Sequence, residues 1–193
     1  MFPALTGTPK CPTTPFEVGL TVTGLTQTSP GGYTPLSYTI VPASGLPSGL
    51  SISATTGTIS GTPATSTALT SYSFMINVSD SNGHWKASPT CAGTVAAALA
   101  ATCPPSSLYY EVNAPFSYLQ ASPVGVAPLA YSVNSPSRLP AGLSINPTSG
   151  AITGTPTATG TVSYVITVRD NVGVTRTSPT CGGTGMTRGS FGL

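Results

Sequence analysis

Four cysteines are the residues of this sequence whose spacing points to a definite chemistry. Two stretches open with Cys-Pro, at Cys11 and Cys103, and close with Ser-Pro-Thr-Cys, at Cys91 and Cys181. The spans are nearly equal, 80 residues (91 − 11) and 78 residues (181 − 103), so the economical pairing is Cys11–Cys91 and Cys103–Cys181. Such bridges stabilise small domains and form in an oxidising compartment. Four buried free thiols are the alternative; zinc is disfavoured because no two cysteines are close in sequence and His84 is the only histidine.

Side chains that could perform acid–base or nucleophilic catalysis are few and are not grouped. Asp80 precedes His84 by four residues, on one expected hairpin turn, and a turn tip offers no cleft for a substrate. Glu17 and Glu111 fall on early strands of different domains, farther apart than the roughly 10 Å that glycoside hydrolysis tolerates between its carboxylates. We therefore expect no enzymatic activity, no catalytic residue and no bound cofactor.

Aromatic side chains are the candidates for ligand contact. Trp85, the only tryptophan, lies between His84 and Lys86 and could stack on the face of a pyranose ring. Packing over the end of the sandwich or into the domain junction, or a contact with another subunit, is the favoured interpretation, since a lone tryptophan is ordinarily buried over much of its area. Thr175 occupies the matching place of the second copy, so the fold does not require an aromatic there. Further candidates for glycan or subunit contact are Tyr33, Tyr109 and Tyr110.

An internal repeat sets the positions of all these residues. The stretch LPSGLSISATTGTISGTP at 46–63 returns as LPAGLSINPTSGAITGTP at 139–156, an offset of 93 residues (139 − 46). This period is too long for a solenoid unit and fits one small β-sandwich domain. The 193 residues therefore divide into two copies of one domain.

Alternating apolar residues within each copy predict strands. Gly57 and Gly150 are expected in tight hairpin turns, where glycine can take a positive φ, and Ile59 and Ile152 begin the returning strands. The other strands are expected at 17–23, 35–41, 50–52, 72–78, 128–133, 143–145 and 162–168. The chain is thus predicted to be all-β, with two tandem β-sandwich domains.

The domain boundaries follow from the cysteines and from composition. Phe191 and Leu193 are apolar residues at the extreme end of a Gly-rich tail and could anchor it to a neighbouring subunit. The expected order is an N-terminal arm at 1–10, domain 1 at 11–91, a linker at 92–102, domain 2 at 103–181 and the tail at 182–193.

Composition excludes several classes of partner. Only 5% of the residues are charged and the net charge is +2, so the surface must consist of Ser, Thr, Asn, Gly and Pro, and no basic patch for nucleic acid is expected. No apolar run approaches the roughly 20 residues needed to cross a bilayer. The first ten residues lack the basic start and apolar core of a secretory signal, which was therefore either removed or never present.

The repeated sequence motifs resemble those of a known family. Leu-Pro-x-Gly-Leu-Ser-Ile, then Thr/Ser-Gly-x-Ile-x-Gly-Thr-Pro, then alternating aromatic and aliphatic residues into Asp-x-x-Gly resemble the putative-Ig, cadherin-like repeats of bacterial surface proteins, haemagglutinin-like adhesins and phage structural proteins. The resemblance spans about 11–91 and 103–181 and implies two tandem Ig-like or cadherin-like β-sandwich domains, used as a spacer, adhesion module or external decoration. Some cadherin-like relatives bind Ca²⁺ between domains through clustered acidic residues. This sequence has four acidic residues, and they are scattered: Glu17, Asp80, Glu111 and Asp170. We therefore expect no bound metal ion.

Together these observations lead to the hypothesis of a non-enzymatic structural protein on the exterior of a large assembly, a phage capsid or tail decoration protein. A virion protein is made in a reducing cytoplasm and oxidised after lysis, which reconciles disulfides with the lack of a signal. The alternatives are a secreted bacterial adhesin or filament subunit and a carbohydrate-binding module. The expected partners are other structural subunits in many copies and, as a further candidate, cell-surface carbohydrate, with neither nucleic acid nor membrane.

Overall fold

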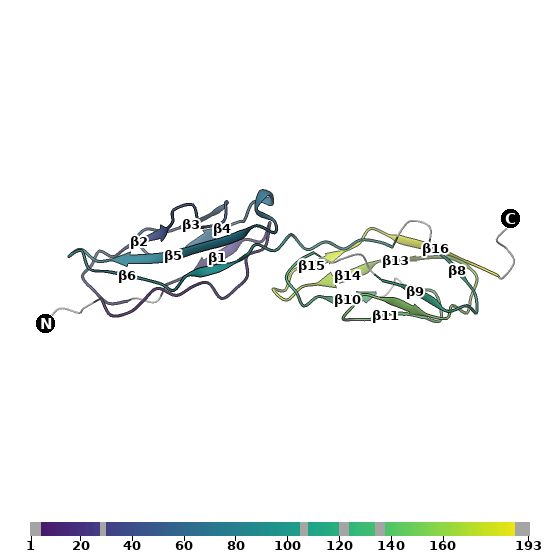
Figure 1. Ribbon diagram of the computed structural model, residues 1–193. Coiled ribbons are helices and arrows are strands. Elements are labelled where there is room, and N and C mark those ends of the chain that lie inside the picture. The colour runs from purple at the N-terminus through teal and green to yellow at the C-terminus, as the bar shows by residue number, and fades with distance from the viewer. Residues whose placement is uncertain (1–4, 28–29, 105–107, 120–123, 134–137, 188–193) are drawn as a thin grey trace. The chain divides into compact units, whose positions relative to one another are not determined.

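The computed structural model describes residues 5–27, 30–104, 108–119, 124–133 and 138–187 (Figure 1). The chain divides into two compact units, Met1–Ala98 and Leu99–Leu193. Nearly all regular structure in the described part is β-strand, with one short 3-10 turn, η1 (Thr65–Thr67). Each unit has its own core of buried apolar side chains. The all-β prediction and the division into two tandem sandwich domains are therefore confirmed.

Two sheets enclose the core of unit 1. The first has the order β1 (Val22–Leu25), β4 (Ile59–Gly61), β3 (Leu50–Ile52). The second has the order β2 (Ser37–Val41), β5 (Ser71–Ser79), β6 (Trp85–Ala87), and β7 (Cys91–Thr94) also pairs with β5. Along β5, Phe74, Ile76 and Val78 alternate with less buried residues and are themselves almost fully buried, because successive side chains of a strand point to opposite faces.

Unit 2 repeats this arrangement with one strand divided. Its first sheet has the order β11 (Leu143–Ile145), β12 (Ile152–Gly154), β9 (Phe116–Tyr118). The counterpart of β5 is split at Val165 into β13 (Gly160–Tyr164) and β14 (Ile166–Arg169). β14 is the central strand of a sheet with the order β10 (Ala130–Val133), β14, β15 (Thr175–Thr177). β13 is an edge strand of another sheet, with the order β13, β16 (Cys181–Met186), β8 (Leu108–Glu111).

A close approach between two backbone segments explains the glycine of the repeated Leu-Pro-x-Gly motif. Gly49 has φ +89°, and the N–H of Thr62 donates to its carbonyl oxygen at 3.0 Å. Gly142 has φ +90° and accepts the same bond from Thr155 at 3.1 Å. A Cβ atom at either glycine would overlap the carbonyl oxygen of the same facing threonine. Both the positive φ and the lack of space therefore require glycine.

The first predicted strand, 17–23, is wrong in its extent. Glu17 pairs in parallel with Ala96, beside the β5–β7 sheet, whereas Val22 pairs with Gly61 in the opposite sheet. Between them Gly19 takes φ +75° and ends the extended run. The segment crosses from one sheet to the other, which one alternating apolar pattern cannot reveal.

The unit boundaries also differ from the predicted ones. Leu5 and Pro9 are buried in unit 1, so residues 5–10 of the expected arm pack with the domain. Val95 is buried in the first core and Leu99 in the second, so most of the expected linker belongs to the units themselves. The start of the expected tail is strand, because β16 continues from Cys181 to Met186.

Candidate functional site

Two disulfides close the two domains in the same way. Cys11 is bonded to Cys91 and Cys103 to Cys181, with a Cα–Cα distance of 5.3 Å in each pair. In each domain the bridge joins the segment before the first strand to the first residue of the last strand, β7 or β16. The structure thus contains both bridges that the cysteine spacing predicts.

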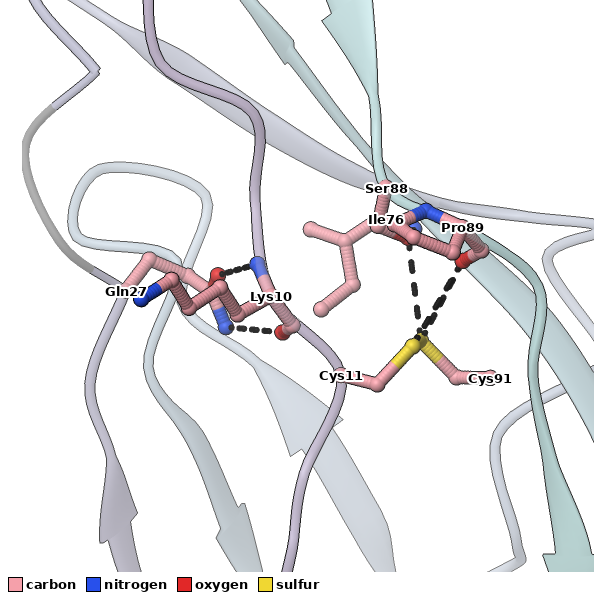
Figure 2. Close-up of a disulfide and its surroundings, with 7 residues drawn as sticks. All are labelled: Lys10, Cys11, Gln27, Ile76, Ser88, Pro89 and Cys91. Atoms are coloured by element: carbon pink, nitrogen blue, oxygen red, sulfur yellow. Dashed lines mark hydrogen bonds between the residues drawn. A yellow bond between two sulfur atoms is a disulfide. The ribbon is translucent and has the colours of Figure 1, made fainter.

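A buried serine beside each bridge explains the repeated Ser-Pro-Thr-Cys word (Figure 2). The backbone N–H of Ile76 donates to Ser88 Oγ at 2.9 Å, and this hydroxyl donates to the carbonyl oxygen of Pro89 at 2.7 Å. Proline has no N–H and interrupts the strand between β6 and β7, so the serine hydroxyl takes the place of a ladder acceptor. Ser178 makes the same two bonds in unit 2, at 2.9 and 2.8 Å. Cys91 Sγ lies 3.6 Å from Ser88 Oγ.

The residue before the first bridge is fixed by a reciprocal pair of hydrogen bonds. Figure 2 shows Lys10 and Gln27 side by side: the Lys10 N–H donates to Gln27 Oε1 at 2.7 Å, and Gln27 Nε2 donates to the Lys10 carbonyl at 3.1 Å. Farther toward the N-terminus, the Thr6 and Gly7 N–H groups both donate to the Pro30 carbonyl at 2.9 Å. The N-terminal segment is therefore attached to unit 1 on both sides of Pro9.

A buried carboxylate organises the hairpin turn before β6. Asp80 accepts hydrogen bonds from the backbone N–H groups of Asn82 and His84, both at 3.0 Å, and of Tyr33 at 3.4 Å. His84 Nδ1 lies 3.1 Å from Asp80 Oδ2. Burial alone raises the pKa of the Asp80 carboxyl, but the hydrogen bonds from His84, Tyr33 and Asn82 outweigh it and hold the pKa below its usual value. Asp80 is thus a structural anion that fixes the turn.

Unit 2 has the same turn without the imidazole. Asp170 accepts hydrogen bonds from the N–H groups of Val172 at 3.1 Å and Val174 at 2.8 Å. Val174 occupies the position of His84, and Asp170 Oδ2 is buried without a hydrogen-bond partner. The carboxylate is therefore common to both repeats, whereas the histidine is particular to the first.

Trp85 lies beside a groove at this turn. Its side chain is 67% exposed, and it pairs with Ser79 in the β5–β6 ladder. The groove has a volume of about 460 Å³ and is lined by Leu5, Gly83, His84, Trp85 and Lys86. Lys86 Nζ donates to the carbonyl oxygen of Thr6 at 3.1 Å. The structure therefore places most of the Trp85 surface in contact with solvent, and a contact with a glycan or another subunit stays a prediction.

The other predicted contact residues are scattered. Tyr109 is 54% exposed on β8, and Tyr33 is half-buried beside Asp80. The prediction for Tyr110 is wrong: its side chain is only 3% exposed, because it alternates with Tyr109 and faces inward, against Phe116 with ring centroids 6.5 Å apart. Phe191 and Leu193, the predicted terminal anchors, lie outside the described residues.

The described residues also bear on metal binding and membrane insertion. Within them, no group of three or more His, Cys, Asp or Glu side chains is placed to hold a metal ion. Glu17 is buried in unit 1 and Glu111 lies on β8 of unit 2. None of the helical structure described is long and apolar enough to span a membrane.

Paired antiparallel sheets around one core in each unit define a tandem of Ig-like β-sandwich domains. Near the two ends of each domain the chain also pairs in parallel, Glu17 with Ala96 in unit 1 and β8 with β16 in unit 2. The chain belongs to the putative Ig domain family, whose model matches residues 7–96 and 96–181. Ig-like domains with internal disulfides are typical of surface and adhesion proteins outside the reducing cytoplasm.

Solved structures show weak similarity. Mouse cadherin-23 EC22-24 is 15% identical over 96% of this chain and 65% of its own, with a TM-score of 0.39. An endo-fucoidan hydrolase of glycoside hydrolase family 107 is 20% identical over 97% of this chain and 30% of its own, with a TM-score of 0.37. A putative alpha-galactosidase from Bacteroides fragilis is 19% identical with a TM-score of 0.38; the match covers 45% of this chain and spans 17% of that enzyme's length. No curated protein sequence matches the chain significantly.

Proposed function

We propose that this protein is a non-enzymatic structural module on the exterior of a large assembly, a decoration protein of a phage capsid or tail. The observation that carries the proposal is the pair of equivalent disulfides, each tying the beginning of a sandwich domain to its last strand. Such closure resists unfolding outside the cell, where no chaperone can refold a damaged subunit.

The surface composition supports a role in assembly. With only 5% charged residues, the domains present Ser, Thr, Gly and Pro over their faces. Neutral polar faces suit many weak contacts with a repeating lattice, where multivalency raises the overall avidity. Docking would then depend on sandwich faces and chain termini, with other structural subunits of the particle as partners.

Two measurements test this proposal. Antibody-labelled electron microscopy of the purified parent particle should place the protein on its outer surface in many copies, and non-reducing peptide mapping should find the Cys11–Cys91 and Cys103–Cys181 peptides joined. Free thiols in the native particle, or absence of the protein from the particle, would contradict the proposal.

A secreted bacterial adhesin or filament subunit is the second candidate, favoured by the same disulfides and by the membership of the putative Ig domain family. Fractionation of a producing cell separates the two candidates. An adhesin would be recovered from the cell surface without any particle, whereas a decoration protein would sediment with the virion.

A further inference from the structure

The groove beside Trp85 has the features of a small-ligand site. Its volume of about 460 Å³ lies within the roughly 300–1,000 Å³ typical of such sites. A protein–protein interface buries roughly 800 Å² on each partner, more than five lining residues provide. A compact ligand therefore fits the groove better than a protein surface does.

The second domain shows that the fold does not require these residues. Thr175 and Arg176 occupy the positions of Trp85 and Lys86, on a strand that pairs with β14 as β6 pairs with β5. Thr175 is exposed, and Arg176 donates to the Thr175 carbonyl at 3.1 Å. Stability of the sandwich therefore does not account for an exposed tryptophan in the first domain.

The lining residues identify the chemistry of the ligand. The exposed indole face suits the C–H surface of a pyranose ring. Lys86 Nζ uses one donor on Thr6, and an ammonium group has three, so two remain for a ligand. His84 is 65% exposed, and its Nδ1 faces Asp80, which leaves Nε2 as the ring nitrogen toward the groove. The Asp80 side chain is fully buried, so none of the described lining residues offers an exposed carboxylate.

We propose that the groove formed by Trp85, His84 and Lys86 binds an acidic glycan, with a sugar ring stacked on the indole and its carboxylate held by the lysine ammonium. The lysine ammonium offers donors only, and a carboxylate supplies a charged acceptor for them, whereas a neutral sugar offers only hydroxyl oxygens, which are weaker acceptors. This site goes beyond the structural role proposed above, and its test does not depend on where the protein is displayed.

The single tryptophan makes the test direct, because all indole fluorescence of the full chain comes from Trp85. Two matched pairs of probes separate charge from ring shape: trigalacturonic acid against its methyl ester, and 3′-sialyllactose against lactose. At least one acid should change the emission saturably, with its neutral counterpart binding about tenfold more weakly or worse. No saturable change with either acid, or equal binding of acid and neutral partner, would overturn the proposal.

The second repeat supplies both a substitution that its own fold already accepts, threonine at the place of Trp85, and a matched control position, Arg176 at the place of Lys86. By calorimetric titration, Trp85→Thr should abolish binding of the acidic probe, and Lys86→Ala should weaken it about tenfold through loss of a charge-assisted hydrogen bond. The matched change Arg176→Ala, in unit 2, should leave it unchanged. Circular dichroism checks that each variant is folded.

Two further results would overturn the site. Wild-type affinity in a folded Trp85→Thr variant would place binding elsewhere. Cell-surface binding that needs Trp85 but survives enzymatic removal of acidic glycans would show that the groove docks a protein.

Discussion

Removing one disulfide should destabilise one domain and leave the other unaffected. The perturbation is the double variant Cys11→Ala/Cys91→Ala, compared with Cys103→Ala/Cys181→Ala. Alanine is preferred to serine because Cys91 and Cys181 are only 3% and 2% exposed, and a serine there would bury a hydroxyl group. The bridged residues are separated by 80 and 78 positions. The loop-entropy relation then gives about 4.5 kcal/mol of stabilisation at 25 °C for each bridge.

This loss is large relative to the stability of one domain. The units contain 98 and 95 residues (193 − 98), and domains of this size are stable by roughly 5–15 kcal/mol. A loss of about 4.5 kcal/mol corresponds to a decrease in Tm of about 20–30 °C. The affected domain should therefore unfold far below the other.

Differential scanning calorimetry of the full chain is the assay. The first variant should lower the transition of unit 1 alone, and the second variant that of unit 2 alone; each is the control for the other. A single transition that both variants lower equally would refute the independence of the two cores. A loss below about 1 kcal/mol in either domain would refute the loop-entropy argument for these bridges.

Three other changes test the packing, each by chemical denaturation followed by circular dichroism. Gly49→Ala should lower the free energy of unfolding by about 3 kcal/mol or more, because the new Cβ atom would overlap backbone atoms. The control Gly83→Ala, also at positive φ but with no atom within 4 Å of the new Cβ, should lower it by about 1 kcal/mol. Equal losses would contradict the close backbone approach at Gly49. Ser88→Ala should cost about 1–3 kcal/mol, because the buried N–H of Ile76 loses its acceptor, and a smaller loss would indicate that another group replaces the hydroxyl. Burial, with a smaller contribution from a nearby tyrosine, raises the pKa of Tyr164 to about 12. The contribution of neutral Tyr164 to the free energy of unfolding is therefore fully present below pH 10, where the tyrosine of the unfolded chain is also neutral. As the pH rises from 10 toward 12, the unfolded chain loses its tyrosine proton first, and about 3 kcal/mol of stability is lost. Tyr164→Phe should flatten this decline, and a pH profile that the substitution leaves unchanged would contradict the burial argument.

Local patterns were sufficient for the fold class and for the sulfur pairing. The motif at 46–63 is repeated 93 residues later (139 − 46), and alternating apolar residues with turn glycines indicate strands wherever they occur. The cysteines flank both copies at nearly equal spacing. These features depend on neighbours in sequence or on a repeated distance along the chain, so they can be read without coordinates.

The candidate site was only partly accessible in this way. Trp85 was recognisable as a lone aromatic between two polar residues, but the groove beside it is also lined by Leu5, about 80 positions away in the sequence. Tyr109 and Tyr110 are adjacent and chemically alike, yet one faces solvent and the other the core. The register of β8 against β16 decides between them, and no residue near Tyr110 encodes that register.

Sequence by itself determined two tandem all-β domains, their cysteine pairing and the glycines of the repeated word. Tertiary structure alone decided where each domain ends and which side chains reach solvent. Ala96 belongs to unit 1 because its carbonyl oxygen accepts from Val18 at 3.0 Å and its N–H donates to Phe16 at 2.8 Å. The physical reason is that backbone groups pair across the sheets with partners distant in the chain, and local composition carries no record of those partners.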